Sequence, residues 1–126
     1  MNRLGVQPVD EDRIKISVSD ASNGVVVKFI GDIDMEDPSI ILDPFFEHIH
    51  IGIIEQNLKE VIADFRELTF LNSSGIKAVA KWIMKLSEVE ETKKYIIKII
   101  HNNEITWQVT SLPTLTFLVP GAVLVE

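Results

Sequence analysis

Apolar and polar residues alternate in a short run near the start of the chain, which is typical of a strand with one buried face. In residues 14–19 every second residue is Ile or Val, and the next run, residues 25–30, is rich in β-branched side chains. Between the two runs, Asn23-Gly24 favours the left-handed backbone of a tight turn. We therefore predict that the two runs pair as a hairpin.

Apolar residues recur at steps of three and four in two later segments, and this spacing predicts helices. Two Asp-Pro pairs, Asp37-Pro38 and Asp43-Pro44, are both typical of helix starts, so the first helix is expected to begin late or to be broken. The second helix is expected from Ser74 to about residue 89, with lysines on its outer face. The predicted buried stripes are Leu42, Phe45, Phe46, Ile49 and Ile53 in the first helix, and Ile76, Val79, Ala80, Ile83 and Leu86 in the second.

The remaining segments alternate between extended and helical patterns. We expect a strand in residues 61–71, a buried strand in 95–100, a short helix in 104–111 that Pro113 ends, and a last strand in 122–125. Residues 114–119 alternate like a strand, and their structure is left open. Residues 1–13 are polar enough to form a loose N-terminal arm, and residues 14–126 form one domain. Because helices between strands act as crossovers, a largely parallel sheet and an α/β fold are favoured.

Composition limits the classes of function. The 126 residues carry a formal net charge of -7, which disfavours binding to nucleic acid and makes a protein partner the default. No apolar run is long enough to span a membrane, the N-terminus lacks the core of a signal peptide, and there is no cysteine. We therefore expect a cytoplasmic protein that does not insert into membranes.

The motifs of enzymes and metal proteins are missing. His48 and His50 are two residues apart, so on a helix they point in different directions. Asp32, Asp34 and Glu36 alternate as at the start of a calcium-binding loop, but the required glycine and the terminal glutamate are absent. There is also no Gly-x-Ser-x-Gly, Walker A or dinucleotide motif. We predict that the chain is not an enzyme and has no cofactor or metal site.

The pattern changes from extended to helical at Ser73-Ser74. A helix start exposes free backbone N–H groups and partial positive charge, so a negative group on a serine there would be stabilised. The alternative is simple capping, since Asn and Ser are preferred at the position before a helix. Trp82, at the edge of the buried stripe, either packs against a loop or stays partly exposed as part of an interface.

Two motifs in the right order resemble the STAS domain, the anti-sigma-factor antagonist family. Residues 64–76, which end in Leu71-Asn72-Ser73-Ser74-Gly75-Ile76, resemble the family's strand that leads into Asp-Ser-Ser-Gly-Leu. Residues 29–34 are similar to its Gly-Glu-Leu-Asp motif, and the resemblance covers about residues 14 to 120. It implies a single-domain mixed sheet with helices packed mainly on one side. The usual last helix is lacking. The sequence departs from the family pattern at Asn72, where an aspartate is usual, and at Lys77, where small or apolar residues are common.

The resemblance implies a regulatory protein-binding module of bacterial partner switching, a form of transcription regulation. The partners would be an anti-sigma factor with serine kinase activity and a phosphatase. Ser73 matches the family's phosphorylation site, and we expect it to precede the helix while Ser74 is held by capping. The alternative is a STAS scaffold that is never phosphorylated, or a small cytoplasmic subunit of a signalling or lipid-transport complex; the oligomeric state is left open. The predicted partner-binding residues are Asp32, Asp34, Asn72, Ser73, Ser74, Gly75, Lys77 and Trp82.

Overall fold

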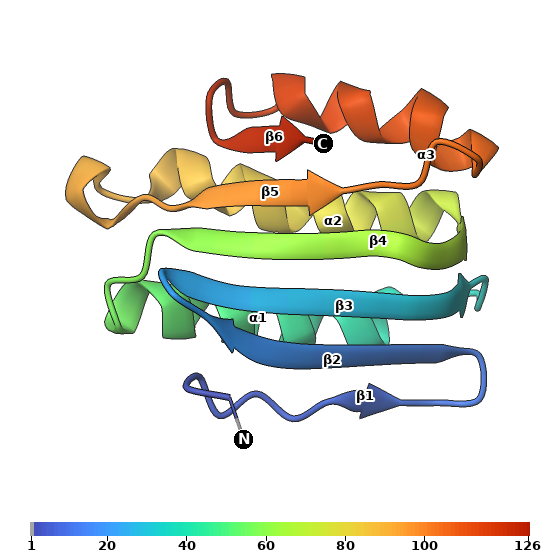
Figure 1. Ribbon diagram of the computed structural model, residues 1–126, viewed down its shortest axis with the longest axis horizontal. Helices are drawn as coiled ribbons and strands as arrows, with labels where there is room; N and C mark the ends of the chain where they lie inside the picture. Colours follow the sequence, from blue (N-terminus) through green and yellow to red (C-terminus); the bar gives the residue numbers. More distant parts are fainter. Residues whose placement is uncertain (1) are drawn as a thin grey trace.

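The computed structural model describes residues 2–126 as a six-stranded mixed β-sheet with helices on one face (Figure 1). β1, β2 and β3 pair antiparallel, whereas β3, β4, β5 and β6 are parallel. The predicted mixed α/β sheet is confirmed. In sequence order, which is also their order in the sheet, the strands are β1 (Val9–Asp10), β2 (Ile14–Ala21), β3 (Gly24–Ile33), β4 (Glu60–Leu71), β5 (Ile96–Ile100) and β6 (Val123–Val125).

Helical structure fills each of the three parallel connections. Because such crossovers are almost always right-handed, strands that follow one another in order place successive helices on the same face. In Figure 1, α1 and α2 lie behind the sheet, while α3 and η3 lie along the β6 edge. Helices mainly on one side were therefore predicted correctly. The α-helices are α1 (Ser39–Glu55), α2 (Ser73–Met84) and α3 (Thr106–Ser111), and the 3-10 helices are η1 (Lys85–Glu88), η2 (Glu91–Lys93) and η3 (Leu112–Phe117).

The hydrophobic core lies between the sheet and the two long helices. Alternate residues of β3 and β4 point toward α1 and α2, and the predicted stripe of α1 is buried against them. Trp82 of α2 stacks on Phe46 of α1, with ring centroids 4.6 Å apart and planes 8° from parallel. Phe29 and Phe65 meet edge to face at 4.9 Å on neighbouring strands. Phe29 also lies 6.1 Å from Phe46 by ring centroids, so aromatic contacts join the two helices to the sheet.

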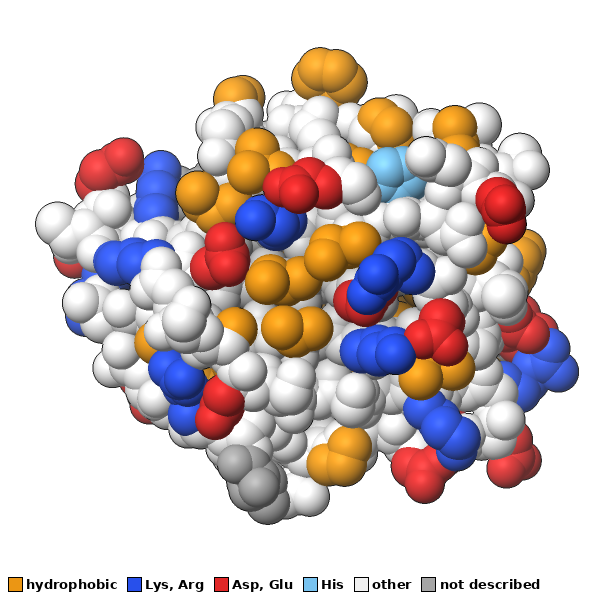
Figure 2. All heavy atoms as spheres, viewed as in Figure 1, with side chains coloured by type: hydrophobic (Ala, Val, Ile, Leu, Met, Phe, Trp, Pro, Cys, Tyr) orange, Lys and Arg blue, Asp and Glu red, His pale blue; other side chains and the backbone are white. Residues whose placement is uncertain are grey.

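The other face of the sheet is open to solvent over the described chain (Figure 2). Apolar side chains such as Ile30, Ile96 and Leu124 are exposed there, interspersed with charges of both signs. The charges pair across neighbouring strands, as Lys28 does with Glu67 at 2.7 Å. An antiparallel or mixed sheet commonly leaves one face solvated in this way.

The predicted hairpin is present, but its turn differs from the prediction. Ala21 lies opposite Gly24, so Ser22-Asn23 forms the turn. The left-handed backbone expected at Asn23-Gly24 is wrong, because neither residue has a positive φ. Gly24 is needed for another reason: a Cβ there would lie 1.6 Å from the carbonyl oxygen of Glu60. Glycine therefore allows β3 to approach the start of β4 closely.

The N-terminal segment is not the loose arm that we predicted. Val9-Asp10 forms β1 against β2, and Leu4 and Val6 are buried in the core. Arg3 fastens the segment further, with its guanidinium donating to the Ala21 carbonyl at 2.9 Å. The few apolar residues of this segment are too widely scattered to produce a recognisable period, which is why the sequence pattern missed them.

The first helix is continuous and neither broken nor late. α1 runs through Pro44, and Pro38 rather than Asp37 stands at its N-cap position. An internal proline costs about 3 kcal/mol. Burying large apolar side chains such as Phe45, Phe46 and Ile49 contributes about 1.5–3 kcal/mol each, which is more than enough to offset that cost.

The C-terminal connection also differs from the prediction in part. A short helix is present as expected, but helical structure continues through Pro113 as η3, and residues 114–119 are not a strand. Gln108 was missed: it is 0% exposed, and its amide donates to the carbonyls of Phe65 at 2.6 Å and Leu68 at 2.9 Å. Two register shifts against β3 make β4 irregular in this region, so a side-chain donor from α3 holds it there.

Within residues 2–126, no helix is long and apolar enough to cross a bilayer. The same residues contain no group of three or more His, Cys, Asp or Glu side chains placed to hold a metal ion.

Candidate functional site

The candidate site lies where β3 and β4 end and α2 begins. Ile33 and Leu71 form the last pair of the β3–β4 register, and the next N–H, that of Asn72, donates to the Ile33 carbonyl at 3.0 Å. The carboxyl ends of parallel strands commonly carry binding sites, because loops and helix N-termini meet there. The predicted strand-to-helix turn at the serines is therefore confirmed, and it lies at a suitable edge of the sheet.

Asn72 caps α2 and holds the acidic loop beside it. Its Oδ1 accepts from the Gly75 N–H at 2.8 Å, and its Nδ2 donates to the Met35 carbonyl at 2.8 Å. An aspartate, which the STAS signature has here, would preserve the cap but could not donate to Met35 when ionised. The amide therefore ties the loop after β3 to the start of α2.

The two serines are free because Asn72 acts as the cap. Ser73 and Ser74 are the first and second residues of α2, and both are exposed. Within residues 2–126 neither hydroxyl nor either backbone N–H of the pair has a hydrogen-bond partner. The predictions that Ser73 precedes the helix and that Ser74 is held by capping are both wrong. The result is a pair of free hydroxyls and free N–H groups at the positive end of a 12-residue helix.

Asp32 and Asp34 lie at the same edge of the sheet and share one cation. The Nη2 atom of Arg13 is 2.8 Å from Asp34 Oδ2 and 3.4 Å from Asp32 Oδ2. The Thr69 hydroxyl also donates to Asp32. Sequence reasoning missed Arg13, because it lies in the segment that we expected to be loose. All these side chains are partly exposed, so the ion pairs are weak and the carboxylates stay accessible to a partner.

Lys77 is exposed one helical turn after Ser73. No carboxylate of residues 2–126 pairs with it, whereas Lys81 and Lys85, which follow at steps of four, pair with acidic residues of α1. Lys77 is thus the lysine of this row that can bind an external anion or a phosphate on the serine turn.

Two of the predicted contact residues are buried. Trp82 is 1% exposed, and its Nε1 donates to the Tyr95 hydroxyl at 2.9 Å, so the partly exposed aromatic that we considered is not what the structure shows. Gly75 is buried as well, and a Cβ there would lie 2.3 Å from Leu71 Cδ1. Both residues shape the site from below and cannot contact a partner directly.

Two exposed apolar side chains that the sequence did not point out lie on elements that meet at the site, one near the end of β4 and one near the start of α1. Phe70 is 46% exposed and lies opposite Asp32 in the β3–β4 register, two residues before the cap. Ile40, in the first turn of α1, is 72% exposed. Ile40 lies outside the predicted buried stripe of α1, and an apolar residue outside such a stripe must face solvent. The sequence could therefore have identified Ile40 as exposed. Exposed apolar groups beside polar ones are typical of protein interfaces.

Comparison with solved structures finds the same fold. An anti-sigma factor antagonist from Mycobacterium paratuberculosis superposes with a TM-score of 0.58 and 20% identity, over 91% of this chain and 88% of the other. SpoIIAA in its unphosphorylated form gives a TM-score of 0.57 and 17% identity, over 88% and 87%. The Bacillus cell fate determinant SpoIIAA in the phosphorylated form gives 0.55 and 19%, over 88% and 90%. No protein-family model and no curated protein sequence matches the chain.

The chain therefore has the STAS fold of the anti-sigma-factor antagonists, as its two motifs predicted. The likeness extends over most of this chain and most of each neighbour, so it concerns a whole domain. At identities of 17% and 20% it establishes the fold, and the function has to be argued from the site.

Proposed function

We propose that this chain is a regulatory protein-binding module of the anti-sigma-factor antagonist kind, with Ser73 as its phosphorylation site. One observation carries the proposal: the Ser73 hydroxyl is exposed and without a partner in residues 2–126, while Asn72 does the capping. Simple capping therefore does not explain the serines. The neighbours of the same fold include anti-sigma factor antagonists, and SpoIIAA was solved in a phosphorylated form.

In the unmodified state, the partner would bind the edge formed by the serine turn, Phe70 and Ile40. A phosphate on Ser73 adds about -1.5 to -2 charges at the first residue of α2. Left unpaired in an interface that excludes water, this charge would weaken binding and release the partner. The phosphate itself remains compatible with the fold, because free N–H groups and the helix dipole lie beside it.

The partners we propose are an anti-sigma factor with serine kinase activity and a phosphatase, in bacterial partner switching. The kinase would supply ATP, Mg²⁺ and the general base. This chain would supply only a positioned hydroxyl, which is consistent with the absence of catalytic motifs in its sequence.

Ser73 is assigned as the acceptor because it matches the phosphorylated serine of the STAS signature. Ser74 lines a hollow of about 240 Å³ between the helices, together with Asp37, Asp43, Lys77 and Lys81, whereas Ser73 does not line it. The two carboxylates and two ammonium groups of this hollow balance, so the choice between the serines follows from the motif.

The alternative is a scaffold of the same fold that is never phosphorylated, such as a small subunit of a signalling or lipid-transport complex. The same exposed edge would serve a constitutive partner equally well. What separates the two functions is the modification itself and its effect on the complex.

The test is intact-mass and phosphopeptide analysis of the protein purified from the cells that naturally make it. We expect an increment of about 80 Da, the mass of one phosphate group, that maps to Ser73. The Ser73→Ala variant should lack the increment and Ser74→Ala should keep it. A phosphate found only on Ser74 would contradict the assignment, and a stable complex with no phosphate on either residue would support the scaffold.

A further inference from the structure

The segment from α3 to β6 carries no charge. Residues 105–125 contain no Asp, Glu, Lys, Arg or His, although 25% of the residues of the chain are charged. Figure 2, in the orientation of Figure 1, shows the result along the β6 edge at the top of the view: the side chains there are apolar or uncharged polar, and the charges of both signs lie farther down. Depletion of charged residues is the compositional mark of an interface core.

Large apolar side chains of this segment face solvent. Val109, Pro113 and Phe117 recur at steps of four along the consecutive helices α3 and η3, and all three are exposed. Phe117 is 79% and Val109 46% exposed, and no other large apolar side chain of residues 2–126 is as exposed as Phe117. Leu112 and Leu115, in the same run, are buried. The outer side of this helical run is therefore apolar, and exposed apolar groups that lie together mark an interaction site.

Three threonines of the segment satisfy their hydroxyls within it, because each donates to a main-chain carbonyl three or four residues earlier. The bonds are Thr110 Oγ1 to Thr106 at 3.2 Å, Thr114 Oγ1 to Ser111 at 2.6 Å, and Thr116 Oγ1 to Pro113 at 2.7 Å. A threonine bonded in this way offers an outside partner its methyl group rather than a donor. The exposed side chains of residues 105–125 thus form an uncharged face that needs few hydrogen bonds from outside.

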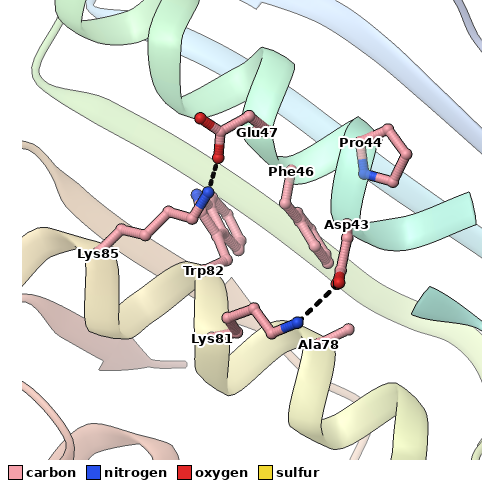
Figure 3. Close-up of a pocket in the computed structure, with 8 residues that line it drawn as sticks. All are labelled: Asp43, Pro44, Phe46, Glu47, Ala78, Lys81, Trp82 and Lys85. Atoms are coloured by element: carbon pink, nitrogen blue, oxygen red, sulfur yellow. Dashed lines mark hydrogen bonds and ion pairs between the residues drawn. The ribbon is translucent and has the colours of Figure 1, made fainter. Parts of the chain in front are cut away.

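Charge decides which kind of partner fits the uncharged face. The 19 acidic and 12 basic residues of the chain all lie outside residues 105–125, and they reach even the outer side of α1 and α2, where Asp43 pairs with Lys81 at 2.7 Å (Figure 3). Complementary charge is a main source of specificity toward a different protein, and the uncharged face has none to pair with. In a twofold contact between two copies each surface meets itself, so two acidic surfaces would repel each other. The uncharged face is the surface on which two copies can meet without that repulsion.

We propose that the chain forms a twofold-symmetric dimer through the uncharged face, with Phe117 of each copy packed against α3 and η3 of the other. A standard interface takes about 800 Å² from each partner, which is about an eighth of the 6650 Å² that this chain exposes. Residues 105–125 are about a sixth of the chain, so most of their exposed surface would be covered. The inference is independent of the proposed function, because it uses no residue of the serine turn.

The test is sedimentation velocity of the full chain at concentrations from about 1 μM to about 500 μM. We expect a reversible monomer–dimer equilibrium with a Kd of about 10–100 μM. Phe117→Glu and Val109→Glu should each raise the Kd about tenfold or more, because the new carboxylates of the two copies meet in an apolar contact. Ile51→Glu makes the same kind of change at a position of α1 that is 43% exposed, and it should leave the Kd unchanged.

Salt distinguishes an apolar contact from an ionic one. Raising NaCl from about 50 to about 500 mM should tighten the dimer, because salt screens the repulsion between two acidic chains, whereas a dimer held by ion pairs would weaken. A parent that stays monomeric at every concentration, or a Phe117→Glu variant that dimerises as tightly as the parent, would overturn the proposal. So would a monomeric parent that floats with phosphatidylcholine vesicles in a density gradient, because the face would then bind lipid. Phosphopeptide mapping of Ser73 succeeds or fails separately from these measurements.

Discussion

Asn72 uses all four of its hydrogen-bonding groups at the point where β3, β4 and α2 meet. Its backbone N–H donates to Ile33 and its carbonyl accepts from Ile76, while its side chain bonds to Met35 and Gly75. A single residue therefore caps the helix, ends the strand pair and fixes the acidic loop. Because this residue does the capping, the serines that follow it are available for another role.

We expect two substitutions of Asn72 to separate the cap from the loop contact. Asn72→Ser keeps a capping oxygen and loses the bond to Met35, which should cost about 0.5–1.5 kcal/mol of unfolding free energy. Asn72→Ala loses the cap as well, which should cost about 1 kcal/mol more. Urea unfolding of both variants measures the difference. Equal losses of unfolding free energy in the two variants would show that the cap contributes nothing to stability. An unchanged unfolding free energy in Asn72→Ser would show that the contact with the Met35 carbonyl contributes nothing.

Part of the site was predictable at the residue scale and part was not. The change of period at Ser73 placed the turn correctly, because a helix start has both a pattern and preferred residues. Arg13 and Phe70 were missed, because they reach the site through strand register and a distant turn, neither of which leaves a local pattern. The degree of exposure of Trp82 was left open for the same reason: it depends on Phe46, which lies on another helix.

At the scale of elements, long periodic segments were predicted well and short irregular ones poorly. The stripe of α1 identified that helix despite Pro44, since apolar burial outweighs one lost hydrogen bond. β1 has only two residues, and η3 buries only Leu112 and Leu115, which is too short a repeat to identify a helix. The structure of residues 114–119 was therefore left open. Gln108 shows the same limit, because a buried glutamine is recognisable only from the carbonyls that it bonds.

A buried polar chain links α1, α2 and the residue before β5. The Trp82 indole can only donate, so the Tyr95 oxygen accepts from it at 2.9 Å. Tyr95 Oη also lies 2.8 Å from His50 Nδ1, and the neutral tautomer with its proton on Nε2 lets the Tyr95 O–H donate to that nitrogen. Burial lowers the pKa of His50, against a smaller opposing effect of Glu88. Burial also raises the pKa of Tyr95, so its hydroxyl stays protonated as a donor.

Acidification should weaken the fold through His50. The folded state holds His50 neutral, whereas the unfolded chain protonates it near its ordinary pKa of about 6.5. The unfolded state therefore binds more protons, and stability falls as the pH drops below about 6.5 toward the lower folded pKa. Urea unfolding between pH 7.5 and 5 should show this loss in the parent and in His48→Gln, the exposed control. His50→Gln should reduce the slope, and an unchanged slope would contradict the assignment.

Phosphorylation should not destabilise the first turn of α2, despite the acidic chain. A phosphate on Ser73 would meet free N–H groups, the positive helix end and Lys77, together worth about 0.3–1 kcal/mol or more at a helix start. We expect the melting temperature of the phosphorylated protein to equal or exceed that of the unmodified one. Lys77→Ala should remove part of the gain, and Lys93→Ala should keep it. A lower melting temperature on phosphorylation, or no effect of Lys77→Ala, would contradict this role for Lys77.

At the scale of the whole molecule, the two faces of the sheet differ in what they offer a partner. The open face mixes exposed apolar groups with charges that are paired within it. The side that carries the helices has the serine turn at one end, and one turn along α2 it has Lys77, which pairs with no carboxylate of residues 2–126. At physiological ionic strength, exposed charges more than about 8 Å apart are largely screened. Although the chain has a net charge of -7, negative charge added at Ser73 should therefore act locally on the interface rather than by altering the fold.

The affinity of the protein for its co-purified partner, measured by titration with the parent, Ser73→Ala, Ser73→Asp and Ser74→Asp, tests the central claim most directly. Ser73→Asp should bind at least about tenfold more weakly than the parent, a loss of about 1.4 kcal/mol or more, because its carboxylate is left unpaired in the interface. Ser73→Ala should bind normally and Ser73→Asp should melt like the parent, since a carboxylate is tolerated at a helix start. If Ser73→Asp binds as tightly as the parent, or only Ser74→Asp is weakened, then charge at Ser73 does not control the partner.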